Sequence, residues 1–175
     1  YTYMNQSLAK WIYRREGIRG ERLRKVKLND PRRGGIFTQP GLMTATANGV
    51  DTSPVIRGVW VLENILGTPP SPPPPDVEPL PTDTREATTI REQLALHRKN
   101  EACRSCHVKI DPMGFAFENF DVVGRWRDRY KRAKGNIDTS STMANGEKIA
   151  DIVEFKKMLM ERKHLIVRCL TKKML

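Results

Sequence analysis

The chain has 175 residues, which suits one domain or two small ones, and 38% of them are hydrophobic, enough for only a modest core. The apolar runs are interrupted and far shorter than the roughly 18 residues that a membrane-spanning helix requires, so no membrane span is expected in this segment. The formal net charge is +11, and ten Lys and Arg residues lie between Lys10 and Arg33. Such a patch suits solvent or an acidic protein partner. No nucleic-acid-reading motif accompanies it, so nucleic acid is not expected as a partner.

Residues 1–68 are predicted to form an N-terminal helical and loop segment. The chain opens at Tyr1-Thr2-Tyr3-Met4 as if in the middle of a helix, and residues 8, 11 and 12 recur at helical spacing before a stop at Gly17. Asn48-Gly49 is a strong turn signal in the loop-rich stretch that follows. Ser53 and Pro54 then predict the N-cap and first residue of a helix that Gly67 ends. We expect that helix to bury Val55, Val59, Leu62 and Leu66.

Residues 69–85 are predicted to be a proline-rich linker. Eight of the thirteen residues from Pro69 to Pro81 are proline, which excludes a helix or a central strand. Such a run favours an extended polyproline II conformation and a role as a semi-rigid spacer. It could also lie along the domain that follows, since a chain with little core gains from packing it down.

Residues 86–175 are predicted to fold as a small helical domain. Thr89 and Glu92 have the capping-box spacing, at the start of a helix whose inward face carries Ile90, Leu94 and His97. A second, short helix is expected around residues 103–109, ending near Asp111-Pro112 because proline disfavours helix in the residue before it. The last helix is expected from about residue 151, with an apolar stripe formed by Ile152, Phe155, Met158, Leu159, Leu165, Ile166 and Cys169.

The strongest chemical signal is Cys103-Arg104-Ser105-Cys106-His107, the Cys-x-x-Cys-His pattern of covalent c-type haem attachment. Positions i and i+3 of a helix lie on one face, so two thiols at this spacing can add to the two vinyl groups on one edge of a porphyrin. The adjacent His107 can then reach the iron as its proximal ligand, and histidine ligation sets the redox chemistry. The motif therefore predicts one haem c, held by Cys103 and Cys106.

Three other interpretations of these residues stay open. Zinc could take Cys103, Cys106, His107 and, as a fourth ligand, His97, although zinc sites usually use two separated ligand pairs. A dithiol redox site would need a βαβ context, whereas the flanking residues here are predicted to be helical. The two cysteines could also be structural. Cys169 lies outside the motif and is expected to be buried as a small hydrophobic residue.

Much of the chain resembles large exported planctomycete cytochrome-c-like proteins. The similar stretches are residues 33–41, 52–60, 66–70 and 103–121, and the last is the most specific because it runs on from the Cys-x-x-Cys-His motif. The resemblance implies a C-terminal haem module of a multidomain, extracytoplasmic protein, periplasmic, at the cell surface or secreted. Residues 1–30 would then be the tail of a preceding module, and the remainder of a larger polypeptide or complex would be a partner.

The second axial position on the iron has two candidates. His97 lies six residues before Cys103 on the apolar face of its helix, and Met143 lies 36 residues after His107, the order used by small c-type cytochromes. Met113 is expected instead to pack against the macrocycle, and His164 to be exposed.

Two arginines, Arg125 and Arg127, are candidates for contacts with the haem propionates through charge-assisted hydrogen bonds, with solvated side chains as the alternative. Glu118 and Asp121 are interpreted as structural caps or ion pairs and not as catalytic carboxylates. The aromatic residues near them are expected to form the core on the haem side: Phe115, Phe117, Phe120 and Trp126.

These expectations add up to a mainly α fold, with a small cytochrome-c-like helical haem domain preceded by a helical and loop segment and a polyproline linker. The expected function is electron transfer with a redox partner protein that could be acidic. A peroxidase-like or oxidase-like enzyme is the alternative if the distal position is open, and a structural or interaction module of a surface assembly is another. No residue is assigned a catalytic role.

Overall fold

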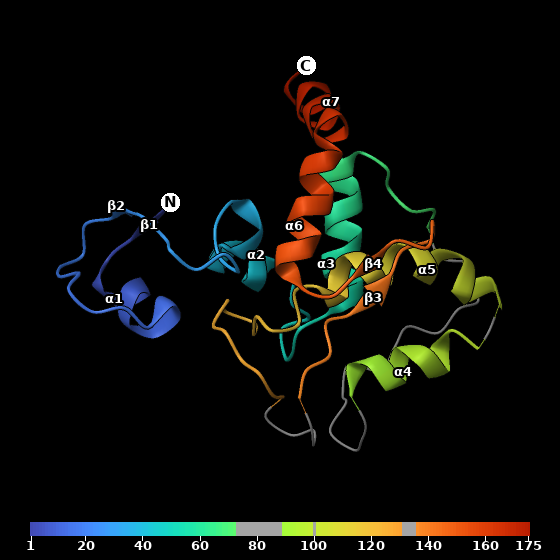
Figure 1. Cartoon of the computed structure of the whole chain (residues 1–175), viewed down its shortest axis with the longest axis horizontal. Coiled ribbons are helices and arrows are strands. Elements are labelled where there is room, and N and C mark those ends of the chain that lie inside the picture. The colour runs from blue at the N-terminus through green and yellow to red at the C-terminus, as the bar shows by residue number, and fades with distance from the viewer. Residues whose placement is uncertain (73–88, 100, 131–135) are drawn as a thin grey trace.

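The computed structural model describes residues 1–72, 89–99, 101–130 and 136–175, and their arrangement is mainly α, as expected (Figure 1). An N-terminal lobe contains β1 (Thr2–Met4), α1 (Gln6–Leu8), the π-helix η1 (Ala9–Tyr13) and β2 (Arg24–Val26). The helical body follows, with η2 (Ile36–Thr38), α2 (Pro40–Ala45), α3 (Pro54–Val61), η3 (Leu62–Leu66), α4 (Ile90–His97), α5 (Glu101–Phe115), β3 (Ser141–Thr142), β4 (Lys148–Ile149), α6 (Ile152–Glu161) and α7 (Lys163–Met174). Within these ranges no helix combines the length and the apolar character that crossing a bilayer requires.

The first residues form a strand, so the expectation of a helix at Tyr1–Met4 was wrong. β1 pairs antiparallel with β2, and Thr2 lies opposite Val26 while Met4 lies opposite Arg24. Thr2 and Met4 are buried and Tyr3 is exposed, which is the two-residue alternation of a strand with one covered face. The short helical stretch begins only at Gln6 and ends at Arg14, earlier than the expected stop at Gly17.

Arg33 contacts both the N-terminal lobe and the helical body. Arg33 Nη1 donates to the Gly124 carbonyl at 2.9 Å, and Nη2 donates to the Ile12 carbonyl of the lobe at 3.3 Å. Its guanidinium carbon also lies 4.8 Å from the ring centre of Tyr13 in the lobe and 5.1 Å from that of Phe120 in the body. Burial lowers the pKa of Arg33. The side chain therefore binds both parts at once.

The helix predicted after Ser53 is present, and both of its ends are confirmed. The Ser53 hydroxyl accepts a hydrogen bond from the Ile56 amide, Pro54 is the first helical residue, and Gly67 ends the last turn in a left-handed conformation. Leu62 and Leu66 are buried as expected, whereas Val55 and Val59 are only partly buried. The fully covered face carries Arg57 and Gly58 instead, because α3 crosses α5 there.

Two glycines allow α3 and α5 to touch backbone to backbone. A Cβ atom on Gly58 would lie 2.1 Å from the Ile110 carbonyl oxygen, and one on Gly114 would lie 1.8 Å from the Pro54 carbonyl oxygen. α5 runs through Pro112 to Phe115, so the expected end near Asp111-Pro112 was wrong. The extra turn buries residues 112–115 against α3, which offsets the hydrogen bond that a proline removes from a helix.

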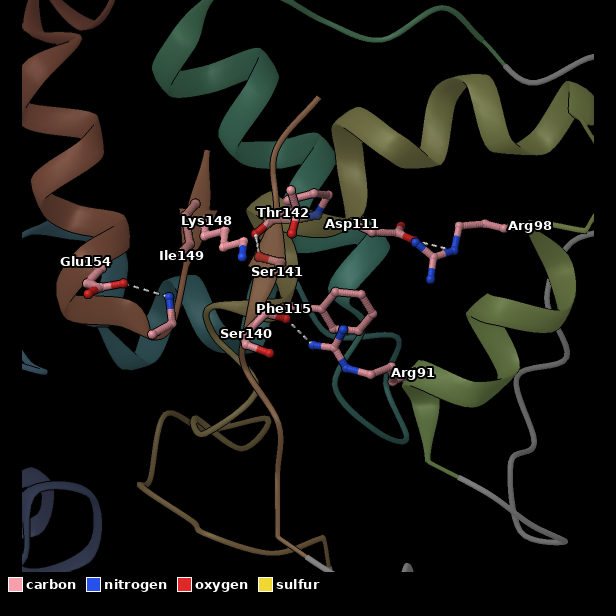
Figure 2. A pocket seen from close by; sticks show the side chains of 12 residues that line it. Arg91, Arg98, Asp111, Phe115, Ser140, Ser141, Thr142, Lys148, Ile149 and Glu154 are labelled. Carbon is pink, nitrogen blue, oxygen red and sulfur yellow. Dashed lines mark hydrogen bonds and ion pairs between the residues drawn. The ribbon is translucent and has the colours of Figure 1, made fainter. Parts of the chain in front are cut away.

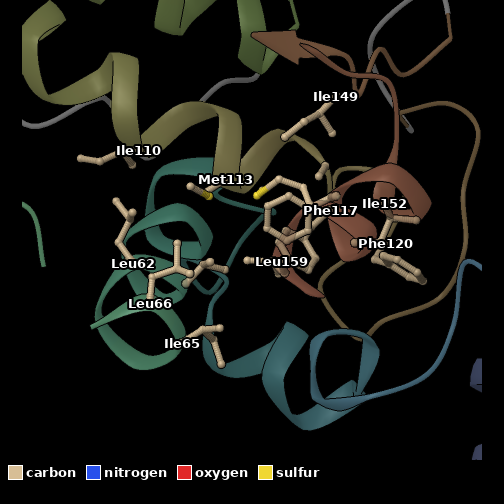
Figure 3. Close-up of a cluster of buried hydrophobic side chains, with 14 of the residues drawn as sticks. Leu62, Ile65, Leu66, Ile110, Met113, Phe117, Phe120, Ile149, Ile152 and Leu159 are labelled. Carbon is tan, nitrogen blue, oxygen red and sulfur yellow. The ribbon is translucent and has the colours of Figure 1, made fainter. Parts of the chain in front are cut away.

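The hydrophobic core draws side chains from both sides of the proline-rich segment (Figure 3). Its buried members come from α2, α3 and η3, from α5 and the turns after it, and from β4 and α6: Met43, Val61, Leu62, Ile65, Leu66, Ile110, Met113, Ala116, Phe117, Phe120, Ile149, Ile152, Phe155, Met158 and Leu159. Residues 73–88 lie outside the described residues, so the polyproline conformation and the boundary at 69–85 stay predictions.

The C-terminal region differs in detail from the single long helix expected there. Asp151 caps α6 by accepting from the amides of Val153 and Glu154, as its position predicted. The helix is then interrupted at Arg162 before α7 begins. Ahead of α6, β3 and β4 form a small antiparallel hairpin that was not expected, with Ser141 opposite Ile149 and Thr142 opposite Lys148. This hairpin lies against α5.

Candidate functional site

The Cys-x-x-Cys-His motif occupies the first two turns of α5, which begins at Glu101. Cys103 is 8% exposed and Cys106 is partly exposed, and both are free thiols. The helix is regular through the motif, so the i and i+3 spacing places both thiols on neighbouring positions of one face. Cys103 and Cys106 are therefore on one helix at the predicted spacing, while their attachment to haem stays a prediction.

His107 is held by a buried carboxylate one turn further along α5. His107 Nδ1 lies 2.7 Å from Asp111 Oδ1, and the Asp111 side chain is 1% exposed. An ionised carboxylate can only accept, so the hydrogen of a neutral imidazole belongs on Nδ1, and Nε2 keeps its lone pair. This is the arrangement by which proteins fix the ring orientation and tautomer of a metal-binding histidine.

Asp111 has a second neighbour, Arg98, which follows the last residue of α4. Arg98 Nε lies 3.6 Å from Asp111 Oδ2, beyond the length of a charge-assisted hydrogen bond. Asp111 Oδ2 is buried and makes no hydrogen bond to the described part of the chain. The carboxylate therefore has one well-made interaction, to His107, and one incomplete interaction, to Arg98.

The structure brings His97 next to His107. Their ring centres are 5.1 Å apart and the ring planes meet at 70°. The capping box predicted for this helix is formed, because the Thr89 amide donates to Glu92 Oε2 at 2.8 Å and the Glu92 amide donates to Thr89 Oγ1 at 3.3 Å. Leu94 is buried, so α4 turns its predicted face inward and directs His97 to the motif. Burial and the neighbouring His107 lower the pKa of His97.

Met143, the other candidate for the distal position, lies on the turn between β3 and β4. Its amide donates to the Glu147 carbonyl, and its side chain packs against the hydrophobic core. Met113 is buried in the same core, and His164 is exposed, as expected. Only His97 of these side chains is seen in contact with the His107 ring.

A pocket of about 540 Å³ opens beside the His107–Asp111 pair, between α4, α5 and the β3–β4 hairpin (Figure 2). Three of its side chains are cationic, namely Arg91, Arg98 and Lys148. Phe115 forms part of the wall, and the Arg91 guanidinium carbon lies 4.0 Å from its ring centre. The remaining lining residues are Asp111, Pro112, Ser140, Ser141, Thr142, Ile149, Ala150 and Glu154.

The two arginines expected at the propionates have carboxylate partners within the protein. Arg125 Nε lies 2.8 Å from Asp121 Oδ2, and Asp121 also caps the turn by accepting from the Val123 and Arg125 amides. Arg127 donates to Thr52 Oγ1 at 2.8 Å and lies 3.4 Å from Glu118 Oε2. The interpretation of Glu118 and Asp121 as structural groups is thus confirmed, while the contacts of both arginines with a propionate stay a prediction.

The aromatic residues after the motif are buried as expected, but in the protein core. Phe117 and Phe120 belong to the cluster between α5 and α6, and Trp126 packs edge-to-face on Phe120. Phe115 is buried and also lines the pocket. Cys169 is 3% exposed on α7 and packs against Gly67, as its small apolar character predicted.

Within the described ranges, no three His, Cys, Asp or Glu side chains come together as a metal-binding group. The zinc interpretation, which needs four such ligands, therefore finds no assembled site here. Haem iron needs only one or two protein ligands, because the porphyrin supplies the other four. The motif, a buried carboxylate on its histidine and a second histidine nearby fit that smaller requirement.

Sequence reasoning missed Asp111, Arg91 and Arg98. His107 and Asp111 are four residues apart, which puts them on one helical face, but the helix was expected to end at Asp111. Arg91 and Arg98 are seven residues apart, which is two helical turns and therefore the same side of α4. Both spacings can be recognised in the sequence and indicate that each pair lies on one side of a helix.

Fold and site together define a mainly α protein in which one helix carries Cys-x-x-Cys-His and a second helix places a histidine beside it. The chain belongs to the PSCyt3 family, a family described as proteins of unknown function (DUF1588), whose sequence profile matches residues 33–130, more than half of the chain. No curated protein and no solved structure matches it. The matched region includes α3, the motif helix and Glu118, while β3, β4, α6 and α7 lie outside it.

Proposed function

We propose that the chain is a c-type cytochrome module with one haem attached to Cys103 and Cys106, and that it transfers electrons. The observation that carries the proposal is the Cys-x-x-Cys-His motif on a regular helix, with His107 held at 2.7 Å by the buried Asp111 carboxylate. The family name, PSCyt3, contains an abbreviation for cytochrome, which supports the same conclusion. A cytochrome-c-like domain over residues 86–175 is part of this proposal.

In the proposed cytochrome, each residue of the motif and its neighbour Asp111 has a defined role. The two thiols form thioethers, His107 presents Nε2 as the proximal ligand, and Asp111 holds the ring by accepting from Nδ1. When bound, the haem supplies a one-electron redox couple between Fe(III) and Fe(II). By sharing negative charge with the imidazole, Asp111 makes it a stronger donor and so favours the oxidised form.

His97 is the proposed distal ligand in preference to Met143. Its ring is 5.1 Å from the His107 ring, centre to centre, whereas the Met143 side chain packs on the hydrophobic core. If haem is bound, His107 would hold the iron and His97, on the neighbouring helix α4, would be the residue to supply a second imidazole. Two imidazole ligands would give low-spin iron.

The proposed partners and compartment rest on the covalent attachment chemistry and on the positive charge of the chain. Covalent attachment retains a cofactor outside the cytoplasm, so we propose an extracytoplasmic location, periplasmic or at the cell surface or secreted. The basic residues of the N-terminal lobe suit an acidic redox partner, with a larger polypeptide or complex around the module.

One observation favours an enzyme as the second candidate. A proximal histidine bonded to a buried carboxylate donates more electron density to iron than one bonded to a neutral group, and this suits activation of peroxide when the sixth position is open. Carbon monoxide separates the two functions, because it binds reduced iron at once only if the distal position is open. A high-spin, carbon monoxide-binding protein would favour the enzyme over electron transfer.

Haem attachment is tested by producing the chain in an exporting host that has a c-type haem attachment system. The intact mass is expected to exceed the polypeptide mass by one haem, and the colour to remain with the protein after extraction with acid and organic solvent. The Cys103→Ala, Cys106→Ala double variant is expected to release its haem, while Cys169→Ala retains it. Colour that leaves the wild-type chain with the solvent would refute the proposal.

A further inference from the structure

The pocket beside Asp111 has a cationic wall that the electron-transfer function does not use. Figure 2 shows Arg91 and Arg98 reaching it from α4 and the residue after it, and Lys148 reaching it from β4. The Arg98 amide donates to the Leu94 carbonyl at 3.0 Å, so the helical path that spaces the two arginines continues to Arg98. A ligand in the pocket would therefore face positive charges from two sides, the α4 side and β4.

The two arginines are positioned but not fully paired. Arg91 donates from Nη2 to the carbonyls of Asp138 and Ser140, at 2.9 and 2.6 Å, and its guanidinium carbon lies 4.0 Å from the Phe115 ring centre. Its buried Nε makes no hydrogen bond to the described residues, although Asp138 Oδ2 lies 3.3 Å away. Among the described residues, the Arg98 side chain has the 3.6 Å approach to Asp111 as its one polar contact. Both therefore retain donors for a ligand.

The carboxylates of the pocket already have other partners. Asp111 accepts from His107, and Glu154 Oε2 accepts from the Ala150 amide at 2.8 Å. Three cationic side chains therefore line the pocket with two carboxylates, of which Asp111 keeps one oxygen without a hydrogen bond to the described residues, and the hydroxyl groups of residues 140–142 add neutral donors to the wall. An arginine fork matches the two oxygens of a carboxylate, and the bond is strengthened by charge.

We propose that this pocket binds carboxylate groups, and that in the haem-loaded chain these are the propionates. The second statement rests on the proposed function. Asp111 lines the pocket and is bonded to His107, so the pocket borders the residue that would hold the haem iron. A free dicarboxylate would be recognised by the same chemistry.

The test uses the full chain carrying Cys103→Ala and Cys106→Ala, in which ferric haem binds reversibly and its Kd can be measured by absorbance. Arg91→Gln and Arg98→Gln are each expected to weaken haem binding about tenfold or more, as the loss of a charge-assisted hydrogen bond requires. Lys109→Gln is the matched control, since Lys109 is exposed on α5 and does not line the pocket, and it is expected to change the Kd less than twofold. Urea unfolding of each variant checks that it is folded.

Esterified haem identifies the source of the carboxylate. The dimethyl ester of haem is expected to bind the parent chain as weakly as haem binds the Arg91→Gln, Arg98→Gln double variant, and to lose nothing further in that variant, because the ester and the two substitutions remove the same interactions. Calorimetric titration with succinate covers the other source. If the arginine substitutions leave the Kd for haem unchanged but abolish succinate binding, the pocket is one for a free carboxylate. If this variant binds no haem, the propionate assignment fails while succinate still decides the pocket, and the proposed function is judged separately by covalent haem attachment to the wild-type chain. Haem and succinate binding that depend on the arginines no more than on Lys109 would overturn the proposal.

Discussion

Two buried carboxylates, Asp111 on α5 and Glu118 just after it, lie seven residues apart and are treated differently by the protein. Glu118 Oε2 accepts from Thr52 Oγ1 at 2.9 Å and from the Tyr130 hydroxyl at 3.0 Å, and lies 3.4 Å from Arg127 Nη2. Its other oxygen is 3.5 Å from Arg57 Nη1. Asp111 has one short bond, to a histidine, and a distant arginine.

The difference separates a structural group from a functional one. Glu118 joins residues 52–57 to residues 118–130, and both of its oxygens are used inside the protein. Burial and the charge of Glu118 raise the pKa of Tyr130, so the phenol stays protonated and remains a donor. Asp111 makes its one short bond to His107 of the Cys-x-x-Cys-His motif, and its second oxygen makes no hydrogen bond to the described residues. A fully satisfied carboxylate stabilises the fold, whereas Asp111 is the carboxylate that the proposed function uses to hold His107.

The largest effect is expected from Glu118→Gln. Removing the charge leaves the Arg57 guanidinium, whose side chain is 1% exposed, without its buried counter-charge. Breaking a buried pair in this way costs about 3–5 kcal/mol of unfolding free energy. Urea denaturation measures it, with Glu161→Gln on the exposed end of α6 as a control that should cost under about 0.5 kcal/mol. A loss below about 1 kcal/mol would mean that Glu118 is not the structural carboxylate of the pair.

Gly114→Ala tests the helix crossing that lies between the two carboxylates. The new Cβ would approach the Pro54 carbonyl oxygen to 1.8 Å, so α3 and α5 must separate. Overpacking of this kind costs about 1–3 kcal/mol. Gly41→Ala in α2 is the matched control, because a Cβ there meets no described atom within 4 Å. Equal stability of the two alanine variants would show that the helices can part without cost.

Asp111→Asn is expected to cost only about 1 kcal/mol in unfolding free energy, since Arg98 is partly exposed and water can solvate it. Its main effect is on the haem-loaded protein. A neutral amide withdraws negative charge from the His107 imidazole, so the oxidised iron loses stabilisation and the midpoint potential rises. Potentiometric titration measures the shift. A potential that moves as much in Glu118→Gln as in Asp111→Asn would erase the distinction between the two carboxylates.

The smallest effect is expected from Asp121→Asn, and it depends on pH. Although burial opposes it, hydrogen bonds from the Arg125 amide and side chain lower the pKa of Asp121 in the folded protein. A carboxylate with a lowered folded-state pKa adds stability above its unfolded pKa and loses it as the pH falls through the folded value. The variant should therefore be about 1 kcal/mol less stable at pH 7 and equal to wild type well below pH 4. A difference that persists in acid would mean that Asp121 acts through packing.

Features set by neighbouring residues were predictable from the sequence. Ser53, Gly67, Thr89 with Glu92, and Asp151 mark helix ends correctly, because a cap forms within one turn of the chain. The two cysteines and His107 were found in the same way, from spacing alone. Short elements were missed, such as β1 and the β3–β4 hairpin, since so few residues do not establish a period.

Features that depend on distant contacts were not predictable. α5 continues past Pro112 because Gly114 can rest on the backbone of Pro54, and nothing near residue 112 in the sequence shows that contact. That error also concealed the site: with the helix ended at Asp111, the pairing of Asp111 with His107 and Arg98 could not be inferred. The buried position of Arg57 likewise depends on Glu118, 61 residues later.

Because α3 and α5 touch through glycine, a small tilt at their crossing is magnified at the far end of α5. Gly114 sits at the crossing, and Cys103 lies eleven residues away, about 16 Å along a stiff helix. A tilt of a few degrees at the crossing would displace the thiol-bearing end by about an ångström while leaving the helix itself intact. A substitution at position 58 or 114 would therefore displace the end of α5 that carries Cys103. The position of the two motif cysteines thus depends on two residues with no side chain.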